Sequence, residues 1–174
     1  MLNVEGAVLS DAFGTPTLDV PPAEWVAAAT RARDELGLRF FDWLSAVDEL
    51  HAGFRLVLHV ADLTTRQRLL LRTLVPRDPA RVESLAAVFA GAAWHEREAA
   101  EMFGLDFVGH PGLEPLLLPD GFTGHPLRKE FLLPARQARP WPGAKEPGES
   151  DTDLADPASP RRRRRHTPPG VPAE

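Results

Sequence analysis

The sequence contains no cysteine among its 174 residues. This excludes disulfide bonds, cysteine-ligated iron–sulfur clusters and catalytic thiols. No apolar run approaches the ~20 residues that a transmembrane helix needs. The first ten residues include Glu5 and no basic residue, so no secretory signal peptide is expected there. We therefore expect the chain to reach a membrane only through partner proteins.

Motifs for nucleotide binding and for nucleophilic catalysis are also missing. No expected strand is followed by a dinucleotide fingerprint or a P-loop, and there is no Gly-x-Ser-x-Gly elbow. The net charge of −5 is mild and gives no reason to expect nucleic acid as the main partner. What is present is 43% hydrophobic residues, enough for a buried core.

Hydrophobic periodicity predicts an α+β fold. A short strand is expected at 17–20, and a helix should begin at Pro22 and end near Gly37. The apolar stripe of this helix has helical spacing: Trp25, Ala28, Ala29, Ala32 and Leu36. Three further strands are expected at 39–47, 54–61 and 68–75, the last two joined as a hairpin.

A second helix is expected after the strands. Asp78 can cap it, Pro79 suits its first position, and its apolar stripe would include Val82, Leu85 and Phe89. One or two more helical turns should follow and end at Gly104. The predicted fold is a small sheet of three to four strands with two main helices on it, followed by an extended Pro-rich C-terminal arm.

Composition divides the chain into three parts. Residues 1–103 are expected to form the α+β core domain. Residues 104–142, dense in Gly, Pro and Leu without regular periodicity, are expected to form a partner-docking arm that orders only on its partner. In residues 143–174, five acids precede the run Arg161–Arg165 and prolines are frequent, so a disordered charged tail is expected.

The densest chemistry lies in the acidic stretch that begins at Trp94. Paired carboxylates could serve acid–base catalysis, but Glu96 and Glu98 are two residues apart and would point in different directions on a helix. A polar helix face that forms ion pairs within or between subunits is favoured. His95, His110 and His125 could bind metal, although their spacing matches no short ligand pattern and turns are favoured. Arg161–Arg165 could bind nucleic acid or anionic lipid, or be neutralised by the acids before it.

Two segments resemble a family of NADH-quinone oxidoreductase subunits, the C subunits, which belong to the peripheral arm of respiratory complex I. Residues 94–111 are similar to the family's Trp-x-Glu-Arg-Glu, acid-Met-Phe-Gly and Gly-His-Pro pattern. Residues 118–131 resemble its Gly-x-Pro-Leu-Arg-Lys-acid-aromatic close. Two departures stand out: Glu101 replaces the usual Asp, and Glu114-Pro115 replaces a usual basic pair.

The resemblance implies a cofactor-free structural subunit within a proton-translocating NADH:quinone oxidoreductase, with no catalytic residues of its own. FMN, iron–sulfur clusters and quinone would belong to the complex as a whole. The implied partners are the large quinone-site subunit and neighbouring iron–sulfur subunits, at the cytoplasmic face of the cell membrane. The equivalent subunit of a membrane-bound NiFe hydrogenase-type complex is the alternative. The motif residues expected at the partner interface are Trp94, Glu96, Arg97, Glu98, Glu101, Phe103, Gly104, Gly109, His110, Pro111, Gly124, Pro126, Leu127, Arg128 and Lys129.

Overall fold

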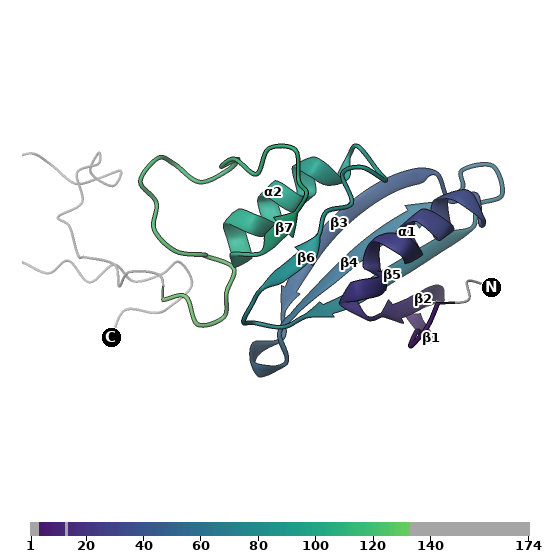
Figure 1. Cartoon of the computed structure of the whole chain (residues 1–174), viewed down its shortest axis with the longest axis horizontal. Coiled ribbons are helices and arrows are strands. Elements are labelled where there is room, and N and C mark those ends of the chain that lie inside the picture. The colour runs from purple at the N-terminus through teal and green to yellow at the C-terminus, as the bar shows by residue number, and fades with distance from the viewer. Residues whose placement is uncertain (1–3, 13, 133–174) are drawn as a thin grey trace, which may run out of the picture. The chain divides into compact units, whose positions relative to one another are not determined.

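The computed structural model describes residues 4–12 and 14–132, and it has the expected α+β fold (Figure 1). A mixed five-stranded sheet has the strand order β1-β2-β5-β4-β3, and a second, two-stranded sheet joins β6 and β7. The strands are β1 (Val8–Ala12), β2 (Thr15–Val20), β3 (Phe40–Asp48), β4 (Phe54–Ala61), β5 (Arg68–Val75), β6 (Arg81–Glu83) and β7 (Asp106–Val108). The helices are α1 (Trp25–Asp34) and α2 (Ala92–Phe103), with short 3-10 turns η1 (Pro22–Glu24) and η2 (Leu50–Ala52).

The large sheet buries one face beneath the helices. Along β4 every second residue is buried, from Phe54 to Val60, which is the alternation expected of a strand with one covered face. β4 pairs antiparallel with β3 and β5, whereas β2 pairs parallel with β5. The four expected strands are confirmed. The fifth, β1, was not expected, because its exposed Val8 and Leu9 show no pattern of burial and it pairs only with β2 at the sheet edge.

The first helix is confirmed with four of its five predicted stripe residues buried, whereas Leu36 lies beyond the end of α1 and is half-buried. Trp25, Ala28, Ala29 and Ala32 are all 0% exposed, and α1 lies across the sheet in Figure 1. Gly37 has a φ of +72°, which favours glycine after a helix. The Leu38 amide closes the helix end by donating to the Ala32 carbonyl.

The second helix does not lie where the sequence pattern placed it. Residues 81–83 form β6, which pairs with β7, and the only helix in this part of the described chain is α2. The predicted stripe residues Val82, Leu85 and Phe89 are indeed buried. They reach the core, however, from β6 and from the turn after it. Apolar residues spaced by three and four positions do not by themselves distinguish a strand followed by a turn from a helix.

The expected boundary after residue 103 is also displaced. β7 pairs with β6, and residues 104–132 belong to the same compact unit as the core. The apolar side chains of the arm were expected to find no partner within the domain, but Leu105 and Phe107 are buried in its core. The rest of the arm, 133–142, and the expected disordered tail, 143–174, lie outside the described residues.

Candidate functional site

Helix α2 carries six of the fifteen expected interface residues, and the fold divides these six between its buried and exposed sides. Its buried residues are Ala92, Glu96, Ala99 and Phe103, which lie on one helical stripe against the sheet. Trp94 and Glu98 lie on the exposed side. A long segment, residues 109–132, runs beside this helix, and we call it the strap (Figure 1).

Glu96 is a core residue. Its side chain is 0% exposed, and its carboxylate accepts hydrogen bonds from the Ser84 hydroxyl at 2.5 Å and the Leu85 amide at 2.6 Å. Burial raises the pKa of Glu96 above its ordinary value, although both hydrogen bonds oppose the shift. Glu96 therefore fixes the turn that follows β6. Neither Glu96 nor Phe103, which is 6% exposed, offers the surface that the interface prediction requires.

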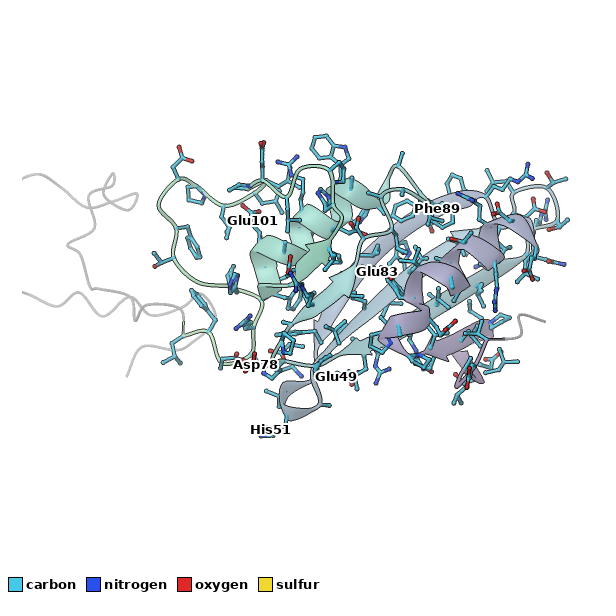
Figure 2. All side chains as sticks on the ribbon, in the orientation of Figure 1. Glu49, His51, Asp78, Glu83, Phe89 and Glu101 are labelled. Carbon is cyan, nitrogen blue, oxygen red and sulfur yellow. The ribbon has the colours of Figure 1, made fainter. Side chains whose placement is uncertain are left out.

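Arg97 and Glu101 hold the first half of the strap by its backbone. The Arg97 guanidinium donates to the carbonyl oxygens of Glu114 at 2.8 Å and Pro115 at 2.6 Å. One helical turn later, the Glu101 carboxylate accepts hydrogen bonds from the amides of residues 116, 117 and 118. Figure 2 shows Glu101 on the side of α2 that faces the strap. Glu114-Pro115, which replaces a basic pair, is compatible with these hydrogen bonds because Arg97 binds backbone carbonyl oxygens.

The Glu101 carboxyl is held in its ionised form. Burial alone would raise its pKa, but the three backbone amides, together with the charge of Arg97, lower the pKa below its ordinary value. A carboxylate surrounded by successive amides is an effective anchor for a loop that has no regular pairing of its own.

The closing motif of the strap caps the end of α2. His125 donates from Nδ1 to the Glu101 carbonyl at 2.8 Å, and Arg128 donates from Nε to the Phe103 carbonyl at 2.6 Å. The Leu127 amide donates to the Met102 carbonyl at 3.1 Å. These bonds satisfy carbonyl groups that the last turn of a helix leaves without partners. Gly104 is required here, because it has a φ of +71° and an added Cβ would lie 2.5 Å from His125 and Arg128.

The distal end of the strap is fastened to the sheet by Asp48. This side chain, 1% exposed, accepts hydrogen bonds from the amides of Leu50 and Lys129 and from Arg77, each at 2.8 Å. Burial opposes ionisation, but these donors lower the pKa of Asp48 below its ordinary value. Arg77 also bonds Glu130 in the strap at 2.5 Å. The Asp48–Arg77–Glu130 cluster was not predicted from the sequence. The signal that could have indicated it is Asp48 itself, a charged residue at the end of the apolar strand β3.

The other motif residues stabilise turns. His110 accepts from the Gly112 amide through Nδ1, so its Nε2 donates to the Ala93 carbonyl at 3.0 Å. Gly124 has a φ of +98°, and an added Cβ there would lie 2.7 Å from the Phe131 ring. His95, on the same helix as Ala93, lies 2.9 Å from the Leu44 carbonyl through Nδ1. The turn-forming roles expected for His110 and the segment around His125 are thus visible.

Several expected interface residues do retain exposed surface, and their contact with a partner stays a prediction. Those that are exposed are Trp94, Glu98, Gly109, Pro111, Gly124, Leu127 and Lys129. Large apolar side chains are prominent among the exposed groups nearby, with Trp94 61%, Leu117 58% and Leu127 52% exposed. Exposed apolar groups on an ordered loop are typical of a surface that binds another protein.

The described residues contain a surface hollow, but neither a metal-binding cluster nor a membrane-spanning helix. A hollow of about 610 Å³ on the uncovered sheet face is lined by Asp19, Glu49, Arg55 and Arg72, whose charges pair with one another. No group of three or more His, Asp or Glu side chains in 4–12 and 14–132 is arranged to hold a metal ion. Within the same ranges, no helix has the length and apolar character to cross a membrane.

Comparisons with known proteins give a consistent result. The family described as "Respiratory-chain NADH dehydrogenase, 30 Kd subunit" matches residues 18–137. The C subunit of NADH-quinone oxidoreductase from Roseiflexus sp. (strain RS-1) is 39% identical over 128 residues, covering 71% of this chain and 74% of that protein. Its namesake from Bordetella avium (strain 197N) is 35% identical over 144 residues, covering 72% and 70%.

Two solved structures share the fold. The trypsin-resistant fragment (1–134) of Nqo5 superimposes with a TM-score of 0.56 at 22% identity, covering 62% of this chain and 90% of that one. A chain of the membrane-bound sulfane sulfur reductase, an archaeal respiratory membrane complex, gives a TM-score of 0.51 at 25% identity, covering 67% and 71%.

Proposed function

Because this chain belongs to the family of the 30 kDa subunit of respiratory-chain NADH dehydrogenase, we propose that it is a structural subunit of a proton-translocating NADH:quinone oxidoreductase. The observation that carries the proposal is the family match over residues 18–137. The relatives at 35% and 39% identity, each over 70% or more of their own length, support it.

Its role in the complex is one of assembly. The chain binds no redox cofactor of its own, which is supported by the lack of cysteine for iron–sulfur ligation and of any phosphate-binding loop. FMN, iron–sulfur clusters and quinone are bound by other subunits. Electrons pass from NADH to quinone through those subunits, and this chain supports the transfer by positioning them.

The partner that fits this role is the large subunit that forms the quinone site, with neighbouring iron–sulfur subunits beside it. The exposed side of α2 and the strap supply the docking surface, supported by their exposed Trp94, Leu117 and Leu127. Because the strap is already bound to α2, it presents this surface preformed. The chain then lies at the cytoplasmic face of the membrane, attached through the complex.

Affinity purification from detergent-solubilised membranes tests the proposal. An N-terminally tagged full-length chain should co-purify with the large subunit and with NADH:quinone oxidoreductase activity, and deletion of its gene should abolish that activity in membranes. An untagged strain is the control. Recovery of the chain alone, with membrane activity unchanged by the deletion, would contradict the proposal.

A second candidate is the equivalent subunit of a related membrane complex, such as a NiFe hydrogenase-type assembly. The likeness to a chain of the sulfane sulfur reductase complex supports this second candidate. The same purification distinguishes the two, since the co-purifying complex would then oxidise a donor other than NADH and lack the NADH-oxidising subunit.

A further inference from the structure

The exposed indole of Trp94 is held in place before any partner binds. Trp94 is 61% exposed, which is unusual for a tryptophan on an ordered helix because its large apolar ring is left in water. The Arg97 guanidinium lies over the ring with 5.2 Å between its Cζ and the ring centroid. Arg97 is itself fixed by its hydrogen bonds to the carbonyls of Glu114 and Pro115. One side of the indole is thus occupied by a cation, while much of the ring is open to solvent.

Two exposed acidic residues, Glu98 and Glu114, belong to the same part of the surface as this indole. Glu98 follows Trp94 by four residues, so both project from the same side of α2. Glu114 is exposed, and its carbonyl is bonded to the same Arg97 that covers the indole. Neither Glu98 nor Glu114 takes part in an ion pair within residues 4–12 and 14–132.

The charge of Arg97 does not neutralise them. Arg97 and Glu101 are one helical turn apart, and Arg97 contributes to the lowered pKa of Glu101. With these two charges opposed, Glu98 and Glu114 give this part of the surface a net negative charge. An exposed π-face on a negatively charged surface has the chemistry that binds a cation.

We propose that Trp94, Glu98 and Glu114 form a receptor for a cationic side chain of a partner protein, with arginine preferred over lysine. A planar guanidinium can stack on the open part of the indole and bind a carboxylate with two parallel hydrogen bonds. The inference rests on the proposed function, since it assigns the chemistry that this docking surface recognises on the neighbouring subunit. The occupant is a basic residue on that subunit rather than the chain's own run Arg161–Arg165.

The first test measures how much full-length chain is retained in the purified complex as salt increases. Trp94→Ala and the double change of Glu98→Gln with Glu114→Gln should each lower retention about three- to tenfold, and Trp94→Phe should lower it less. Glu114→Lys should give the largest loss, because it repels the cation. Glu5→Lys is the matched control: it makes the same charge change at an exposed position outside α2 and the strap, and retention should match wild type.

The effects of Glu98→Gln and Glu114→Gln should shrink at high salt, since exposed charges are screened. Circular dichroism should show that every variant keeps the wild-type unfolding midpoint, because all three positions are exposed. Retention at the wild-type level in the Trp94 and Glu114 variants would overturn the inference.

The second test identifies the occupant directly. A photo-reactive amino acid placed at position 94 should, in the assembled complex, cross-link to a segment of another subunit that contains Arg or Lys. Cross-linking to a segment without a basic residue, or to residues 161–165 of the same chain, would overturn the inference. If the wild-type chain does not co-purify with NADH:quinone oxidoreductase subunits at all, the proposed function fails instead, so the two failures are distinguishable.

Discussion

The sheet and the strap are held in place by different forces. In the sheet, side chains such as Leu56, Leu58 and Leu71 are 0% exposed, so apolar burial supplies the stabilisation. From residue 109 to 132 no residue is buried. The strap is fixed by polar side chains of the core, chiefly Arg97, Glu101 and Asp48, that bind its backbone.

This contrast shows how a chain can present an apolar docking surface without unfolding or aggregating. Because hydrogen bonds rather than apolar burial fix the strap, its large apolar side chains Leu117 and Leu127 remain exposed for a partner. It also means that the strap depends on polar contacts spread along its length. Loss of one of these contacts should loosen the part of the strap that it holds while the sheet stays folded, whereas loss of Glu96, which fixes a turn inside the core, should destabilise the whole domain.

The largest effect is expected at Glu96, on the buried side of α2. Glu96→Ala leaves the Leu85 amide without a partner and opens a cavity, which should lower the free energy of unfolding by about 2–4 kcal/mol. Glu96→Gln keeps the shape and one acceptor and should cost about 1 kcal/mol or less. Urea unfolding of the full-length variants measures both. A Glu96→Ala variant as stable as wild type would show that the core does not depend on this group.

A smaller effect is expected at Asp48, which joins the sheet to the strap. Asp48→Asn weakens the bonds to Arg77 and to the Lys129 amide, and should cost about 1–3 kcal/mol. The strap contains two trypsin sites, Arg128 and Lys129. Limited digestion should therefore cut after these residues much faster in the variant than in wild type, while the sheet remains intact. Equal cleavage rates would mean that Asp48 does not hold the strap.

The smallest effects should come from pH, and they have opposite signs in the two regions. The pKa of Glu96 is raised, so its contribution to stability is full below its unfolded-state pKa and is lost as pH rises through the folded pKa. The pKa of Asp48 is lowered, so its contribution is present above its unfolded-state pKa and is lost as pH falls through the folded pKa.

Unfolding experiments from pH 7 downward can separate these contributions. The stability of wild type relative to Glu96→Gln should rise as pH falls toward 4.5, the ordinary pKa of a glutamate. The stability of wild type relative to Asp48→Asn should fall once pH drops below 3.8, the ordinary pKa of an aspartate. Parallel curves for the two variants would show that the two carboxyls occupy similar environments.

Local sequence patterns predict the sheet well and the strap poorly, for a physical reason. Alternation in β4 and the stripe of α1 report burial on one face, and burial is what orders those elements. The strap has no such periodicity, because its position depends on bonds to residues far away in the sequence, such as Lys129 to Asp48. Composition alone therefore predicted an arm that orders only on its partner.

The prediction of the second helix was wrong for the same reason, namely that the local pattern carries no information on partners far away in the sequence. Val82, Leu85 and Phe89 have helical spacing, but β6 forms because Val82 pairs beside Phe107, and the following turn is fixed by Glu96. Both partners are distant in the sequence. For the site, composition singled out the acidic stretch that begins at Trp94, and the resemblance to a family added the remaining motif residues. The sequence did not reveal that Glu96 lies in the core while Arg97 and Glu101 hold the strap.

Hydrogen exchange on the isolated full-length chain tests the central claim most directly. The amides of Leu117 and Lys129 should be protected in wild type, because Glu101 and Asp48 accept their hydrogen bonds. Glu101→Ala should remove the protection of Leu117 and leave that of Leu58 in β4 unchanged. If strap amides already exchange at the rate of an unfolded peptide in wild type, the strap is not preformed on α2, and the account is contradicted.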